Sequence, residues 1–191
     1  MTIHTTPGGS DVENGRGYST LTVLDQPSVP LAAVRVNDLA MDALAECARV
    51  VAEALPPALE REGAAITGHL VVVFYRVGGI DSAHAKSDVA IGFPIETPLE
   101  EEIAVVSDAT SAFTDLAART VTLPEGRIAA LSHNGPYSTR DDSWNALLTT
   151  LTDRGLEPTP PFWEVSVPVG ENDTVVTTSR TDLFAPLAPL N

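Results

Sequence analysis

The chain is poor in cysteine and in basic residues, and each shortage excludes a class of protein. Its 191 residues include one cysteine, Cys47, so no disulfide can form within the chain and a cytoplasmic location is expected. The Ala- and Val-rich context of Cys47 favours a core residue over a nucleophile. Only 11 Lys and Arg stand against 26 Asp and Glu, a formal net charge of −15. We therefore expect no direct nucleic-acid partner, because phosphate binding needs clustered basic residues.

Long apolar runs are also missing. The longest, residues 70–75, is too short to cross a bilayer, so we expect no membrane insertion. Residues 1–19 have neither a basic segment nor an apolar segment of the kind found in secretory signals, and their Gly, Ser and Thr content predicts a disordered tail.

The net negative charge of the chain has two interpretations. The first, which we favour, is solubility or a salt-adapted composition, and the second is nucleic-acid mimicry or attraction of cationic ligands.

Several catalytic and metal-binding patterns are absent from the sequence. There is no G-x-S-x-G element, no P-loop and no dinucleotide fingerprint. His69 and His84 have no partners at metal-ligand spacing, and the acidic run 100–102 reads as a solvated turn. We therefore expect neither a metal nor a cofactor.

The remaining chain, residues 20–191, reads as a single domain in which one pattern of strand, helix, strand, strand occurs twice. The first half, about 28–96, has a strand in 31–36, a helix capped by Asn37 or Asp38 that ends at Gly63 with a break or kink at Pro56-Pro57, and strands at 70–75 and 88–96. The second half, about 119–187, has a strand in 120–132, a helix that ends at Gly155, and strands at 162–167 and 174–187.

Between the halves, residues 97–118 read as an acidic insert with a short helix at 111–119. The repetition predicts an α+β fold of two similar halves related by a pseudo-twofold axis. A cleft between such halves is a natural ligand site.

The residue that calls for explanation is Glu164, an acid within the apolar strand F-W-E-V-S-V. Burying a carboxylate without a partner is costly, so our hypothesis is that the missing partner is a ligand. Alternation places Glu164 and Ser166 on one face of the strand and Trp163 on the other. Periodicity alone leaves open whether the Glu164 face lies in solvent or lines a cleft.

Several motifs together resemble one known family. The segments are L-P-E-G-R-I-A-A-L-S-H-N-G-P-Y, then Trp144, then G-L-E-P-T-P-P-F-W-E-V, then T-D-L-F-A-P-L. They look like the GyrI-like family, the effector-binding domain also found attached to bacterial multidrug-responsive transcription activators. The resemblance is strongest over 119–187 and weaker over 28–96. It implies an α+β fold of duplicated βαββ units, with an antiparallel sheet, helices on one face and a ligand cleft on the other.

The resemblance also implies a ligand and a site. The cleft of the family takes apolar, often cationic aromatic compounds, and Glu164 matches the acid that sits in it. The candidate ligand-binding residues are Glu164, Trp163, Trp144, Tyr137, Ser166, Tyr75, Phe93 and His133. Core packing is the stronger alternative for Trp144, and stabilisation of a turn is the stronger alternative for His133. Ser166 departs from the Tyr of many members, and the 97–118 insert is a second departure.

Three functions compete. The first is a stand-alone small-molecule-binding protein that holds apolar or cationic aromatic compounds against Glu164 in drug or toxin response. The second is a hydrolase that opens a strained, cyclopropane-type ring of a DNA-alkylating natural product, with Glu164 as general base and Tyr137 stabilising an oxyanion. The third is an acidic protein-binding modulator of a partner such as a topoisomerase.

Overall fold

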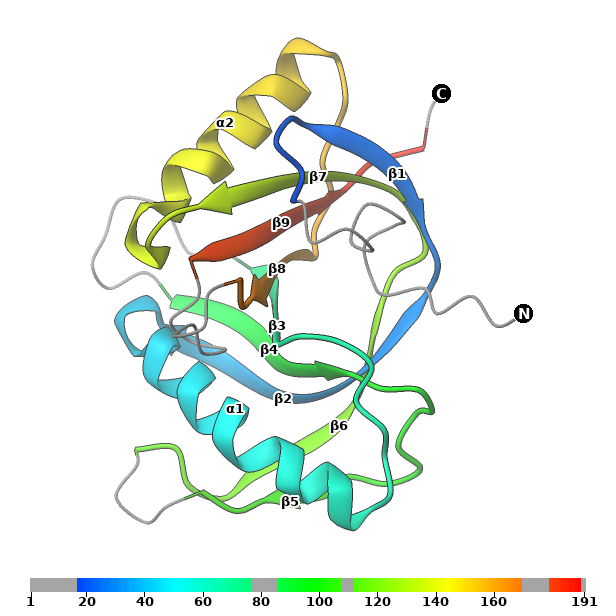
Figure 1. Ribbon diagram of the computed structural model, residues 1–191, viewed down its shortest axis with the longest axis vertical. Helices are drawn as coiled ribbons and strands as arrows, with labels where there is room; N and C mark the ends of the chain where they lie inside the picture. The colour runs from blue at the N-terminus through cyan, green and yellow to red at the C-terminus, as the bar shows by residue number, and fades with distance from the viewer. Residues whose placement is uncertain (1–16, 77–85, 108–111, 170–178, 190–191) are drawn as a thin grey trace. The chain divides into compact units, whose positions relative to one another are not determined.

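The computed structural model describes residues 17–76, 86–107, 112–169 and 179–189, which fall into two compact units (Figure 1). Unit 1 consists of residues 1–28 and 124–191, and unit 2 of residues 29–123. Most of the expected tail, His84 and the start of the expected last strand lie outside the described residues. Within the part that is described, no helix is long and apolar enough to span a membrane.

Unit 2 is an antiparallel sheet with one long helix. Its elements are β2 (Val29–Ala40), the 3-10 helix η2 (Met41–Ala43), α1 (Leu44–Arg61), β3 (Val71–Arg76), β4 (Lys86–Pro94), β5 (Ile103–Val105) and β6 (Leu116–Leu123). The strands lie in the order β3-β4-β2-β6-β5. Helix α1 contacts β5, β4 and β2 of this sheet.

Unit 1 has the same construction. Its elements are β1 (Thr22–Gln26), β7 (Gly126–Asn134), the 3-10 helix η3 (Tyr137–Thr139), α2 (Arg140–Asp153), β8 (Phe162–Val167) and β9 (Arg180–Pro186). The strands lie in the order β1-β7-β9-β8, again antiparallel. Each unit therefore contains one βαββ motif, β2-α1-β3-β4 or β7-α2-β8-β9, with the last strand between the other two. The predicted α+β class and the duplication are confirmed.

The two helices end in the same way. Gly63 and Gly155 have φ of 70° and 66°, the left-handed conformation that residues with a side chain rarely adopt. The residue after each glycine donates its N–H to the carbonyl of Leu59 or Leu151, at 2.9 Å in both units. These glycines are C′ residues, as the sequence predicts, and they give a reference point for comparing the two repeats position by position.

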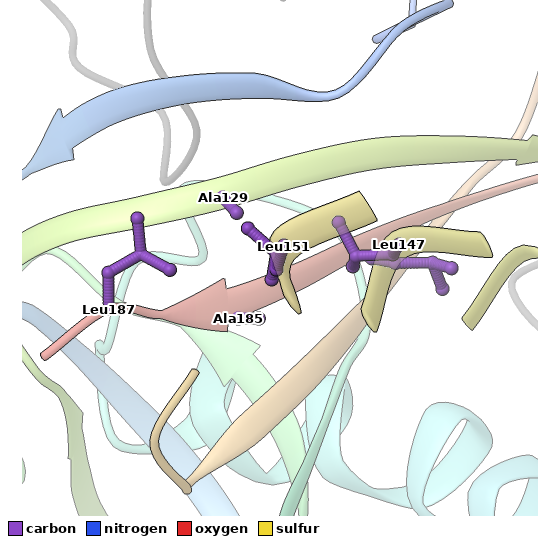
Figure 2. Packing of buried hydrophobic residues seen from close by; sticks show 6 residues of the cluster. Ala129, Leu147, Leu151, Ala185 and Leu187 are labelled. Atoms are coloured by element: carbon purple, nitrogen blue, oxygen red, sulfur yellow. The ribbon is translucent and has the colours of Figure 1, made fainter. Parts of the chain in front are cut away.

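The core of unit 1 lies between α2 and its sheet. Leu147 and Leu151 of the helix pack on Ala129 of β7 and on Leu183 and Ala185 of β9 (Figure 2). All five side chains are fully buried. Each leucine buried to this extent contributes about 1.5–3 kcal/mol to the stability of the unit.

Helix α1 differs from the sequence prediction at its start and at its two prolines. It begins at Leu44 and is not capped by Asn37 or Asp38, because β2 continues to Ala40 through its pairing with β4. It also runs unbroken through Pro56 and Pro57 to Arg61. The prolines lie toward solvent, where water can satisfy the carbonyls that lose their partners, while Leu55 and Leu59 remain buried.

The expected insert 97–118 is part of the sheet of unit 2. Strand β5 pairs with β6, and Leu99 N donates to the Thr120 hydroxyl at 2.8 Å. The short helix expected at 111–119 is wrong for the described residues, since β6 begins at Leu116 and pairs with β2. Strand pairing on two sides outweighs the helical propensity of Leu116 and its alanine neighbours.

Candidate functional site

Strand β8 places Glu164 beneath helix α2. Glu164 lies opposite Leu183 of β9, and Leu183 belongs to the core cluster under that helix. Directly paired residues point to the same face of a sheet, so the Glu164 side chain faces α2. Only 2% of Glu164 is exposed. The carboxylate is therefore on the helix face of its sheet, whereas the family resemblance placed it in a cleft opposite the helices.

Three side chains of unit 1 donate hydrogen bonds to this carboxylate. The Tyr137 hydroxyl donates to Oε2 at 2.8 Å. Arg140 Nε and Trp144 Nε1 both donate to Oε1, at 2.8 and 2.7 Å. Residues four apart lie on one face of a helix, which is why Arg140 and Trp144 reach the same oxygen from the start of α2. These four residues form the Glu164 cluster.

Arg140 makes more contacts than its ion pair with Glu164. Its guanidinium lies 4.0 Å from the centre of the Tyr137 ring, a cation–π contact. Its Nη1 lies 3.1 Å from an Asp141 oxygen, and 12% of the Arg140 side chain is exposed. A cation at the first residue of a helix opposes the helix dipole, which costs roughly 0.3–1 kcal/mol. Its attraction to Glu164 offsets that cost.

The electrostatics of the cluster favour an ionised Arg140 and a neutral Tyr137. Burial alone lowers the pKa of Arg140, but attraction to Glu164 and its neighbours outweighs burial and raises that pKa above its ordinary value. Burial, followed by the negative charge of Glu164, raises the pKa of the Tyr137 hydroxyl well above its ordinary value. Tyr137 is therefore a proton donor to Glu164 throughout the neutral range.

Unit 2 has no such cluster at the corresponding positions. Counted from the helix-end glycines, the three positions correspond to small apolar residues: Glu164 to Val72, Arg140 to Ala48 and Trp144 to Ala52. The two buried leucines of each helix do correspond, Leu55 to Leu147 and Leu59 to Leu151. The βαββ unit is thus stable with an apolar core here, and the charged residues of unit 1 are not required to build it.

These contacts revise the hypothesis about the missing partner of Glu164. The sequence suggested that only a ligand would compensate the buried charge, but the chain itself supplies Arg140 and two further donors. Arg140 was missed by sequence reasoning. Its signal in the sequence is a basic residue at the start of a helix, four residues before Trp144.

Ser166 and His133 share the helix face with Glu164. Ser166 lies two residues after Glu164 on β8 and is half-buried. His133 contacts the Ser143 hydroxyl through Nδ1 at 2.9 Å and the Pro136 carbonyl through Nε2 at 3.0 Å. One ring nitrogen contacts α2 itself and the other contacts the segment between β7 and α2, which supports the turn-stabilising interpretation of His133.

Trp163 points away from the Glu164 cluster. It is fully buried and stacks on Phe184, with ring centres 5.8 Å apart and planes 17° from parallel. Phe184 and Tyr18 pack in a T-shaped arrangement, with ring centres 5.8 Å apart and planes at 81° to each other. Trp144 packs instead on Phe162, on the helix face. The two tryptophans therefore lie on opposite faces of the sheet of unit 1.

Tyr75 and Phe93 lie on opposite faces of the sheet of unit 2. The Arg35 guanidinium lies 4.4 Å from the Tyr75 ring centre, so Tyr75 is on the Arg35 face of the sheet. Phe93 is paired with Ala32, which alternates with Ala33 and Arg35 and so points to the other face. Phe93 is 5% exposed, as expected for a core residue.

A second polar network lies on the face opposite α2. Tyr18 N donates to the Ser132 hydroxyl at 2.6 Å, and that hydroxyl donates to Asp182. Arg180 donates to both Asp182 oxygens, at 2.8 and 2.6 Å. Tyr18 is 4% exposed, so residues 17–19 are ordered rather than part of a disordered tail. The Gly, Ser and Thr residues around Tyr18 gave no sign of this contact in the sequence. Among the described side chains, no group of three or more His, Cys, Asp or Glu is placed to hold a metal ion.

Several solved bacterial proteins share the fold of this chain. The fold is also the one that the resemblance to the GyrI-like family implies. Neither protein-family models nor curated protein sequences match the chain. The EcmrR C-terminal domain matches with a TM-score of 0.65 and 11% identity, over 90% of this chain and 98% of that domain. In the structure of the EcmrR–DNA complex, the match spans 58% of the EcmrR chain.

Two further structures share the fold. A hydrolase from Listeria innocua has a TM-score of 0.57 and 11% identity, over 93% of this chain and 96% of its own. SAV2435, solved with bound tetraphenylphosphonium, has a TM-score of 0.54 and 13% identity, over 88% of this chain and 94% of its own. At these identities, the likeness concerns the fold.

Proposed function

We propose that the protein binds apolar or cationic aromatic compounds at the Glu164 cluster and acts in a response to drugs or toxins. The support from relatives is that SAV2435, which has the same fold, was solved with tetraphenylphosphonium, a lipophilic aromatic cation. The proposal gives Glu164 the role of charge partner and gives Tyr137 and Trp144 the role of aromatic contacts.

The observation that carries the proposal is the pairing of a buried carboxylate with an aromatic face. Glu164 already holds a planar cation, the Arg140 guanidinium, which also lies over the Tyr137 ring. An aromatic cation needs the same two features, an acidic partner and a ring to stack on. Unit 2 has Val72 where unit 1 has Glu164, so a βαββ unit can form without an acid at this position.

Binding fits Glu164 better than catalysis. A general base must take a proton from water, which requires an accessible oxygen with a free acceptor position. Glu164 is 2% exposed, and its three hydrogen bonds occupy most of the acceptor positions of the carboxylate. The strained-ring hydrolase is therefore the less favoured function, and the topoisomerase modulator stays a prediction.

Calorimetric titration with tetraphenylphosphonium tests the proposal. We expect micromolar binding by the wild-type protein and at least about tenfold weaker binding by Glu164→Gln, which corresponds to about 1.4 kcal/mol. Glu157→Gln is the matched control, because Glu157 is an exposed acid of the same unit. Equal affinity of Glu164→Gln and the wild type would mean that the cation binds at a site without Glu164. If the wild type and both variants fail to bind the cation, the proposed binding function is rejected.

A further inference from the structure

We infer that Arg140 is a tethered cation that occupies the Glu164 carboxylate, and that it selects ligands by requiring them to displace it. The inference rests on the proposed function and adds a specificity-determining residue to it. The ligand class that follows is that of lipophilic cations with delocalised charge and aromatic rings.

The contacts of Arg140 are those that an aromatic cation would need. Its Nε is 2.8 Å from Glu164 Oε1, and its guanidinium is 4.0 Å from the centre of the Tyr137 ring. Arg140 and a ligand cation therefore compete for one carboxylate and one aromatic face. A buried carboxylate supports one close cation well, and a second cation beside it would be repelled.

The structure also provides a place for the displaced guanidinium. Asp141, next along the helix, already lies 3.1 Å from Arg140 Nη1, and its side chain is 75% exposed. Rotation of the Arg140 side chain toward Asp141 keeps the arginine paired while it leaves Glu164. A solvated Arg–Asp pair is worth little, about 0–1 kcal/mol, so the exchange still costs free energy that the ligand must supply.

That cost determines which ligands succeed. A small, strongly hydrated ammonium ion must give up its hydration and brings no apolar surface to offset the loss. A cation with several aromatic rings is weakly hydrated and gains roughly 25 cal/mol for each Å² of apolar surface it buries. Arg140 thereby excludes simple cations, while large aromatic cations can replace it.

The first test compares affinities for two probes, tetraphenylphosphonium and its neutral analogue triphenylphosphine oxide. We expect Arg140→Met to bind tetraphenylphosphonium at least about tenfold more tightly than the wild type, with little change for the neutral probe. Arg154→Met is the matched control, because Arg154 is an exposed arginine at the other end of α2. Unchanged or weaker cation binding by a folded Arg140→Met protein would overturn the inference.

The second test uses the wild-type protein and so does not depend on a variant that folds. Phenylglyoxal modifies accessible arginines, and mass spectrometry reads each site separately. With 12% of its side chain exposed, Arg140 should react slowly in the free protein and at least about threefold faster at saturating tetraphenylphosphonium. Arg154 should react equally in both states.

The outcomes separate the two proposals. If tetraphenylphosphonium binds but Arg140 labelling does not rise, the displacement is wrong and the proposed function stands. If the cation binds no variant and Arg140 labelling does not change, both fail. Faster labelling of Arg140 together with tighter binding by Arg140→Met supports the displacement.

Discussion

Tyr137 and Glu164 are joined by a hydrogen bond of 2.8 Å in which the phenol donates to Oε2. Burial and the charge of Glu164 raise the pKa of this phenol well above its ordinary value of 10.0. The folded state therefore holds the proton more tightly than the unfolded state. The stabilisation is fully present below about pH 10, where both states are protonated, and is lost as the pH rises toward the folded pKa.

The resulting prediction concerns stability in alkali. Above about pH 10, the free energy of unfolding should fall by up to roughly 1.4 kcal/mol per pH unit from this group alone. Tyr137→Phe should have a shallower fall, which urea unfolding at a series of pH values measures. Tyr75 contributes a fall of its own, because burial raises its pKa as well. The difference between the wild type and Tyr137→Phe is therefore the quantity to compare, and identical slopes would contradict the prediction.

The second prediction concerns the ion pair between Glu164 and Arg140. Removing one partner leaves a buried charge without compensation, so Arg140→Ala and Glu164→Val should each lower the free energy of unfolding by about 3–5 kcal/mol. The double variant has the residues of unit 2 at these positions, Ala48 and Val72. It should recover most of the loss, since apolar replacements of buried ion pairs are often neutral.

A double-mutant cycle from urea unfolding measures this coupling. If each single change costs about 3–5 kcal/mol and the double variant recovers most of the loss, the coupling free energy is at least about 3 kcal/mol, the upper end of the range found for residues in direct contact. The paired Arg49→Ala and Glu53→Ala changes provide the control, because that helix pair is exposed and should couple by about 0.3–0.5 kcal/mol. Additive effects of the Glu164 and Arg140 changes would show that the pair is not coupled.

The third prediction separates the hydrogen bond of Trp144 from its packing. Trp144→Phe removes the 2.7 Å bond to Glu164 and keeps an aromatic ring against Phe162. Loss of a hydrogen bond to a charged group should cost about 1.5–3 kcal/mol of stability. Trp163→Phe has no such bond to lose, because Trp163 Nε1 has no hydrogen-bond partner among the described residues. A Trp144→Phe protein as stable as the wild type would contradict the role assigned to this hydrogen bond.

Sequence reasoning succeeded where the signal is local. Helix-end glycines, the repeated strand pattern and the acid in an apolar strand all depend on neighbouring residues, so the helix ends and the duplicated fold were predictable, and Glu164 could be singled out as an acid that needs a partner. The partner of Glu164 was not predictable, since Arg140 is 24 residues away along the chain and meets it only after α2 packs on β8. The face of Glu164 depends on strand register, which periodicity alone leaves undetermined.

The fourth prediction concerns Gly17, where the chain passes close to Ser132 and Arg180. A Cβ at Gly17 would lie 2.7 Å from Arg180 Nε and 2.8 Å from Ser132 Cβ, closer than such atoms approach in proteins. Neither side chain can move freely, because Asp182 holds both by hydrogen bonds. Gly17→Ala should therefore lower the free energy of unfolding by about 1–3 kcal/mol, a typical cost of overpacking.

Limited proteolysis distinguishes local release from global loss in the Gly17→Ala protein. If the clash detaches Tyr18 from Phe184, cleavage near residue 18 should accelerate in Gly17→Ala while the rest of unit 1 stays resistant. Ser19→Ala is the control, because Ser19 is exposed and adjacent in sequence. Equal stability and equal cleavage of Gly17→Ala and the wild type would mean that Ser132, Asp182 and Arg180 rearrange around the new methyl group without loss of free energy. The buried position of Tyr18 would then depend on its aromatic contact with Phe184.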